Sequence, residues 1–129
     1  MGEPAVGPTG LRHLALRVRN TARASAFYTE YFGMRVVWQP DDATAYLSSG
    51  GDNLALHEHA DAAPGGALDH LGFFVATPGD VVSLAARMRA RGVEIVAEPR
   101  RHRDGSESFY CKDPDGNVVQ VLWVPETMR

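Results

Sequence analysis

The feature that most constrains the fold of this chain is an internal repeat. The segment LRHLALRV (11–18) and the segment LDHLGFFV (68–75) match position for position, and both carry histidine in third place. Each segment alternates in the manner of a half-buried strand. A helical stretch and three short apolar stretches follow in the same order each time. Repetition of this kind indicates two copies of one structural unit.

Helix start and stop signals support the repeat. Asn20 and Thr21 precede a stripe of apolar residues spaced as on one helix face, and Gly33 ends it. In the second copy, TPGD (77–80) has a capping threonine, a proline and an acid, and Gly92 closes the helix. The strands expected after the helices span 34–39, 43–49 and 53–59, and then 93–99, 106–112 and 117–123. We therefore predict an α+β fold in which two βαβββ modules form a cupped mixed sheet.

The same pattern sets the predicted domain organisation. We expect a flexible N-terminal tail (1–10), a single domain (11–124) and a C-terminal tail (125–129). Within the domain, module one covers 11–59, the Ala-, Pro- and Gly-rich linker covers 60–67, and module two covers 68–124. A chain of 129 residues is long enough to bury one hydrophobic core.

The amino-acid composition argues against several classes of function. The chain is 44% hydrophobic and 22% charged with a formal net charge of −3, so it lacks the basic surface expected of a nucleic-acid or anionic-membrane partner. No apolar run approaches the roughly 18 residues of a membrane span, and the first ten residues do not resemble a signal peptide. Cys111 is the only cysteine, which excludes an intrachain disulfide. We expect a cytoplasmic protein.

Strand alternation assigns side chains to the two faces of each sheet. With the apolar positions packed under the helices, His13, His57, His70 and Gln120 point into the concave face. Nitrogen and oxygen donors at two-fold-related positions suggest a divalent-metal site. Each histidine taken alone is more often a hydrogen-bonded structural residue, so the metal interpretation rests on their equivalent places in the repeat.

The repeat and four segments identify a family resemblance. These segments are LRHLALRV, ASAFYTEYFGM, LDHLGFFV and FYCKDPDGNVVQVLW. Together they resemble the vicinal oxygen chelate superfamily, which includes glyoxalase I, extradiol dioxygenases, fosfomycin-resistance thiol transferases and bleomycin-resistance proteins. The resemblance covers about residues 11–124. It implies paired modules around a cupped site, often in a homodimer that exchanges modules between chains.

The resemblance also implies a ligand set. Its metal-binding positions fall on His13, His57, His70 and Gln120, and the implied cofactor is a divalent transition metal such as Fe, Zn, Ni or Mn. Glutamate usually stands where this chain has Gln120, and a neutral amide cannot serve as a proton-transfer base. The departure leaves two functions open.

The first function is a metal-dependent enzyme of lyase, isomerase or dioxygenase type that acts on a small oxygen-bearing substrate. The second is a metal-free binding protein that sequesters an aromatic natural product or antibiotic. Its cup would use apolar walls, for which the candidates are Trp38, Tyr46, Phe74, Tyr110 and Leu122.

One basic loop lies near the expected cup. Residues 99–108 include Arg100, Arg101 and Arg103, which could meet an anionic substrate or simply be solvated. We expect His102, in the same loop, to be exposed.

Overall fold

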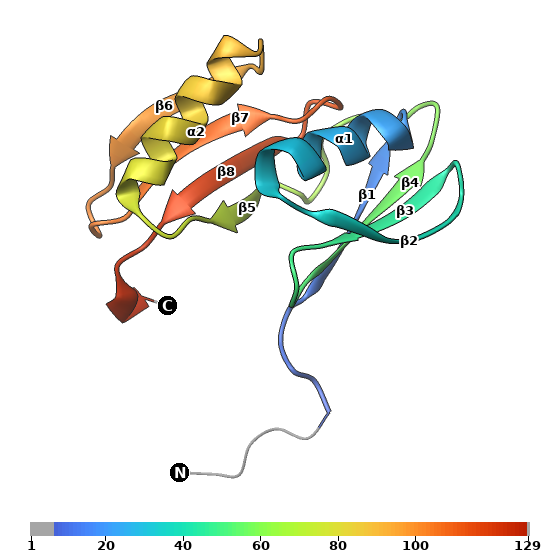
Figure 1. Ribbon diagram of the computed structural model, residues 1–129, viewed down its shortest axis with the longest axis horizontal. Helices are drawn as coiled ribbons and strands as arrows, with labels where there is room; N and C mark the ends of the chain where they lie inside the picture. Colours follow the sequence, from blue (N-terminus) through green and yellow to red (C-terminus); the bar gives the residue numbers. More distant parts are fainter. Residues whose placement is uncertain (1–6, 129) are drawn as a thin grey trace.

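The computed structural model describes residues 7–128 and contains two modules of the same construction (Figure 1). Module one comprises β1 (His13–Val18), α1 (Thr21–Phe32), β2 (Arg35–Asp41), β3 (Thr44–Ser48) and β4 (Asn53–Glu58). Module two comprises β5 (Leu71–Phe74), α2 (Pro78–Ala90), β6 (Ile95–Arg101), β7 (Glu107–Lys112) and β8 (Val118–Trp123), and a 3-10 turn follows at Glu126–Met128. Residues 1–6 and 129 of the expected tails lie outside the described residues.

The two sheets have the same topology. Their strand orders are β1-β4-β3-β2 and β5-β8-β7-β6. In each sheet the first strand runs parallel to the last, and the remaining pairs are antiparallel. The predicted α+β class and duplicated architecture are confirmed. Within residues 7–128, no helix is long and apolar enough to span a membrane.

The helix boundaries follow from the predicted caps. The Asn20 side chain accepts a hydrogen bond from the backbone N–H of Arg23, and Gly33 ends α1 at φ 66°, a left-handed conformation that suits glycine. At α2, Thr77 and Asp80 form a reciprocal capping box. Cap chemistry therefore fixes where each helix starts over its sheet.

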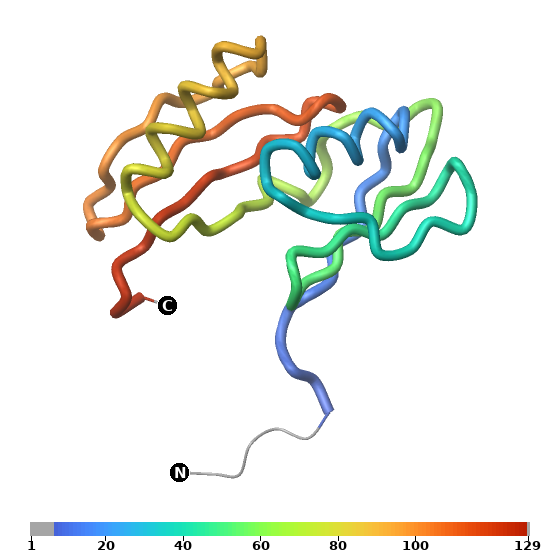
Figure 2. The backbone as a smooth tube through the Cα atoms, in the orientation of Figure 1, coloured from blue at the N-terminus to red at the C-terminus, as the bar shows by residue number. Residues whose placement is uncertain are grey.

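One hydrophobic core runs through both modules, between the helices and the sheets. At the junction, the rings of Phe32 and Phe73 stack with centroids 4.0 Å apart. The two sheets lie side by side with both helices on the same side, while the N-terminal arm and the C-terminal turn extend on the other (Figures 1 and 2). The two helix-free faces are therefore not folded onto each other within one chain.

Candidate functional site

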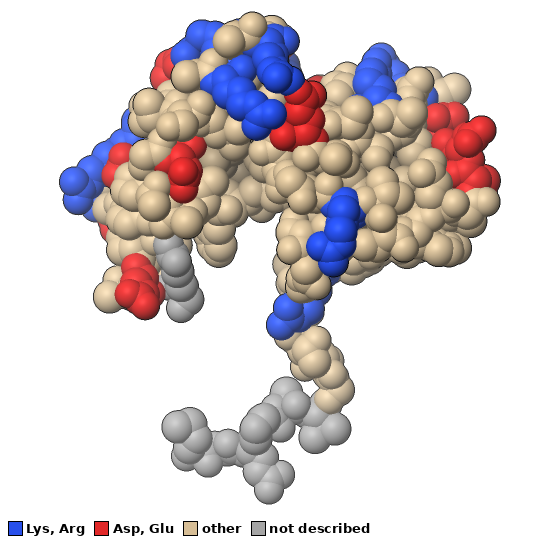
Figure 3. Space-filling view, viewed as in Figure 1, with Lys and Arg blue, Asp and Glu red and all other residues tan. Residues whose placement is uncertain are grey.

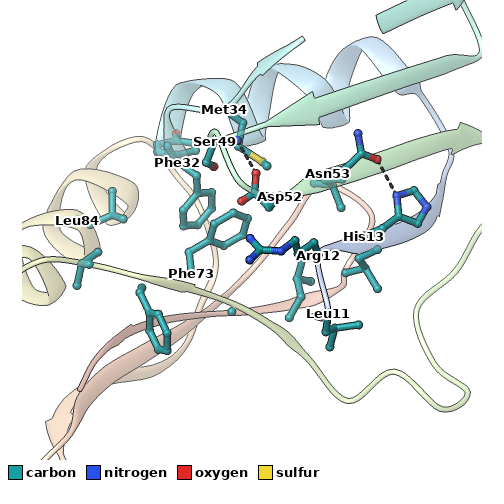
Figure 4. A pocket seen from close by; sticks show the side chains of 17 residues that line it. Leu11, Arg12, His13, Phe32, Met34, Ser49, Asp52, Asn53, Phe73 and Leu84 are labelled. Carbon is teal, nitrogen blue, oxygen red and sulfur yellow. Dashed lines mark hydrogen bonds between the residues drawn. The ribbon is translucent and has the colours of Figure 1, made fainter. Parts of the chain in front are cut away.

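On the helix-free face of module one, His13 stands at the start of β1. Its Nδ1 lies 2.7 Å from Oδ1 of Asn53, the residue opposite it on β4. Because the amide oxygen can only accept, Nδ1 carries the proton and Nε2 keeps its lone pair. The same hydrogen bond appears in Figure 4, at the edge of the pocket drawn there. The imidazole is therefore oriented and has one nitrogen left for a ligand.

Aromatic side chains line the rest of this face. The Tyr46 ring lies 6.1 Å from the His13 ring and 6.4 Å from the His57 ring, measured between centroids. Trp38 packs edge-on against Tyr46 at 4.8 Å and remains 52% exposed. Tyr46 is therefore in contact range of both histidines.

On the helix-free face of module two, His70 also has an oxygen acceptor at Nδ1, although the acceptor belongs to the adjacent residue in the chain and not to the facing strand. Its Nδ1 lies 2.6 Å from Oδ2 of Asp69, and its ring meets Tyr110 edge-on at 5.4 Å. On β8, Gln120 pairs with Tyr110 of β7 on one side and with Gly72 of β5 on the other. A Cβ added at Gly72 would be 3.7 Å from Gln120 Oε1, so the amide side chain lies over the glycine.

Strand register separates His57 from the other predicted ligands. His13 pairs with Asn53, whereas His57 pairs with Arg17, four residues further along. At about 3.3 Å per residue, this offset is roughly 13 Å. The residue of β4 that corresponds to Gln120 is Ala55. Gln120 pairs with Gly72, two residues after His70, and Ala55 pairs with Ala15, two residues after His13.

The predicted ligands do not converge within one chain. His13 belongs to the first sheet, while His70 and Gln120 lie on the face of the second. Among residues 7–128, no group of three or more histidine, cysteine, aspartate or glutamate side chains is placed to hold a metal ion. Within the described residues, His13, His57 and His70 therefore form no common metal site.

The sequence did not identify two residues that contribute to the helix-free face of module two. His102, expected to be exposed, is half-buried, and its Nε2 lies 2.6 Å from Oγ of Ser108. Ser108 is 1% exposed and shares strand parity with Tyr110. The alternation of β7 could have revealed the position of Ser108. The contact with His102 depends on the path of the chain beyond β6.

A cavity lies at the junction of the modules. It has a volume of about 590 Å³ and includes Arg12, Phe32, Phe73 and Leu84 in its lining (Figure 4). His13 and Phe74 also line it, whereas His70 and Gln120 do not. This cavity therefore borders the helix-free face of module two at Gly72 and Phe74 without reaching the other predicted ligands.

Burial controls the ionisation of two groups beneath the sheets. It raises the pKa of the Cys111 thiol to about 12, and the negative charge of Asp113 adds to the effect. The pKa of the Tyr28 hydroxyl is also raised, first by burial and then by Asp113. A buried thiol with a raised pKa is a poor nucleophile, so Cys111 is a core residue.

Comparison with known proteins identifies the family. The sequence model of the Glyoxalase/Bleomycin resistance protein/Dioxygenase superfamily matches residues 10–121. The chain belongs to this superfamily. The predicted resemblance is thereby confirmed at the level of the superfamily.

Curated members of the superfamily share about a quarter of the sequence. A lactoylglutathione lyase of Arabidopsis thaliana is 27% identical over 120 residues, which cover 85% of this chain and 42% of that protein. The chain thus spans about two fifths of that protein's length. The metallothiol transferase FosB of Bacillus licheniformis is 25% identical over 115 residues, covering 87% of this chain and 73% of FosB.

Solved structures of the superfamily agree with the fold. A lactoylglutathione lyase of Agrobacterium tumefaciens is 26% identical, with a TM-score of 0.73 and coverage of 91% of this chain and 95% of that one. These superfamily members carry different activities by name, so the reaction must be argued from the site.

Proposed function

We propose that this protein is a divalent-metal-dependent enzyme acting on a small oxygen-bearing substrate. The supporting observation is that two imidazoles share one hydrogen-bonding pattern at Nδ1. His13 and His70 each direct Nδ1 to an oxygen acceptor and leave Nε2 for a ligand. Metal-binding histidines characteristically use the second nitrogen in this way, which fixes the ring and its tautomer. The donor set therefore fits a transition-metal ion.

We further propose that the site forms between two copies of the chain. Module one of one copy would face module two of the other, so that His13 meets His70 and Gln120 of the partner subunit. The open helix-free faces support this arrangement, as do the apolar side chains left on them. Phe74 is 68% exposed and Trp38 52% exposed, so both offer apolar surface that a second copy of the chain could cover.

The ligands in this proposal are His13, His70 and Gln120, with His57 outside the set because of its register. A bound divalent ion would act as a Lewis acid toward adjacent substrate oxygens and stabilise negative charge that develops there. The two imidazoles and the amide oxygen hold and orient the ion without neutralising it. Tyr46, Trp38 and Phe74 form walls that exclude water.

One observation favours a second function, a metal-free binding protein for aromatic natural products or antibiotics. Both faces carry aromatic side chains, including Trp38, Tyr46, Phe74 and Tyr110, and Gln120 supplies an amide donor and acceptor without charge. Such a surface suits a planar ligand. The paired imidazole orientation has no role in that function.

Metal analysis of untagged protein tests the proposal. We expect near-stoichiometric transition metal in the wild type and its loss in His70→Ala, while His59→Ala at an exposed position retains it. Wild-type protein that contains no metal, binds none when titrated, and yet binds an aromatic drug tightly would establish the second function instead.

A further inference from the structure

The register of module two places a group of polar residues beside the proposed site. Gly72, Gln120, Tyr110 and Ala97 form one row across the four strands of the sheet. The next row consists of Phe74, Leu122, Ser108 and Arg100. Residues opposite each other in neighbouring strands share a face. Arg100 and Ser108 therefore belong to the same helix-free face as Gln120.

His102 extends this second row beyond the end of β6. Its backbone N–H bonds to the carbonyl of Ser106, and its Nε2 lies 2.6 Å from Ser108 Oγ. If the hydroxyl donates to Nε2, the ring proton sits on Nδ1 and becomes a free donor. No other hydrogen bond engages the His102 ring among residues 7–128. In that arrangement Ser108, which is almost completely buried, holds the imidazole with one N–H uncommitted.

The neighbouring arginines differ in the face they occupy. Arg100 lies opposite Ser108, whereas Arg101 lies opposite Glu107 on the other face. Within residues 7–128, no hydrogen bond or ion pair engages the Arg100 guanidinium. The nearby acid Asp104 accepts hydrogen bonds from the N–H and Oγ of Ser106. Arg100 therefore presents an unpaired positive charge to the proposed cup.

We propose that Arg100 and His102, the latter held by Ser108, bind an anionic group of the substrate. A guanidinium and an imidazole N–H suit a carboxylate, phosphate or phosphonate. Figure 3 shows the largest group of basic side chains over α2 and a smaller basic group, with acidic side chains beside it, at the outer edge of module two.

The inference rests on the proposed function, because it describes the far end of the same substrate. From the strand spacings, the Cα of Arg100 lies about two strands (~10 Å) across and one row (~7 Å) along from that of Gln120. The long arginine side chain shortens this gap. The substrate class is a small molecule with chelating oxygens at one end and an anion at the other.

Calorimetric titration of the full-length protein with phenylphosphonate tests the inference. The titration uses EDTA-treated protein, because the anion contacts require no metal. We expect millimolar or tighter binding that weakens about tenfold or more in Arg100→Gln, as expected on losing a charge-assisted contact. His102→Gln should also weaken binding. Arg101→Gln, with the same charge change on the opposite face, should bind like the wild type.

Two results would overturn the inference: wild-type protein that does not bind phenylphosphonate, or equal losses in Arg100→Gln and Arg101→Gln, which would indicate general electrostatic attraction. Metal titration of the wild-type protein separates this outcome from failure of the proposed function. Normal metal binding without phenylphosphonate binding refutes only the anion site. Phenylphosphonate binding without metal binding refutes only the metal enzyme.

Discussion

The Tyr28 hydroxyl donates a 2.7 Å hydrogen bond to Oδ2 of Asp113, across the junction between the modules. Tyr28 lies on α1 of module one, and Asp113 opens the turn between β7 and β8 of module two. Both residues are buried, and Asp113 also accepts the backbone N–H groups of Asp115 and Asn117. This contact therefore joins the helix of one module to the organised turn of the other.

Tyr28→Phe should destabilise the protein, because the mutation leaves a buried carboxylate with one donor fewer. A hydrogen bond to a charged group contributes about 1.5–3 kcal/mol, and we expect a loss of that size in the free energy of unfolding. Urea unfolding followed by circular dichroism measures it. Tyr31→Phe, on the same helix, is the matched control and should change stability by less than about 0.5 kcal/mol. Equal effects of the two substitutions would show that the contact is not stabilising.

The buried Cys111 thiol should make stability fall at alkaline pH. Burial, with the charge of Asp113, raises the folded-state pKa from 9.0 to about 12, so the unfolded chain releases the proton first. The stabilisation is complete below about pH 9 and is lost as pH rises from there toward 12. The slope reaches at most about 1.4 kcal/mol per pH unit.

This pH effect is measured as the difference between wild type and Cys111→Ala in urea unfolding at pH 8 to 10.5. The wild type should lose stability faster than the variant over that range, since Tyr28 titrates in both proteins. Parallel pH curves would contradict the raised thiol pKa. At pH 8 the native thiol should also react with Ellman's reagent only at the rate of unfolding.

Gln120→Glu should tighten metal binding by about tenfold or more, because a carboxylate neutralises part of the ion's charge. Competition titration with a chromogenic chelator measures the affinity. Gln39→Glu, at an exposed position on β2, adds the same charge away from the face and serves as the control. If Gln120→Glu only lowers stability and leaves metal affinity unchanged, Gln120 is a structural amide.

Mixed dimers should distinguish sites formed between chains from sites within one chain. In the exchanged arrangement, a His13→Ala chain paired with a His70→Ala chain contains one site with both histidines intact. We expect each variant alone to bind little metal and the refolded mixture to recover up to about one site per mixed dimer. The mixture would recover nothing if His13 and His70 met within the same chain, because every site would then lack one ligand.

Much of the fold was predictable because its signals are local. Asn20, Thr77 and Gly33 specify helix ends through hydrogen bonds within a few residues, and alternation assigns strand faces. Register is different, since it depends on the partner strand. Alternation therefore predicted that His57 lies on the same face of the sheet as His13. It could not show that His57 lies four residues along β4 from Asn53, the residue that pairs with His13.

Contacts between residues far apart in the chain could not be predicted from the sequence. The side-by-side placement of the sheets depends on contacts such as the Phe32–Phe73 stack, between residues far apart in the chain. His102 was expected to be exposed because it lies in a basic, polar segment. In its half-buried position the ring contacts Ser108, and no periodic pattern encodes that contact.

The turn that begins at Asp113 limits how far the two modules can replace each other. Asp115 Oδ1 accepts the backbone N–H of Arg19 and contacts the Arg23 guanidinium, so module two completes the start of α1 in module one. In the matching turn of module one, Asp52 accepts from Ser48 and Ser49 of its own module. The halves are thus no longer interchangeable. Recombination that replaced module two with a second copy of module one would remove the acceptors on which the first helix depends.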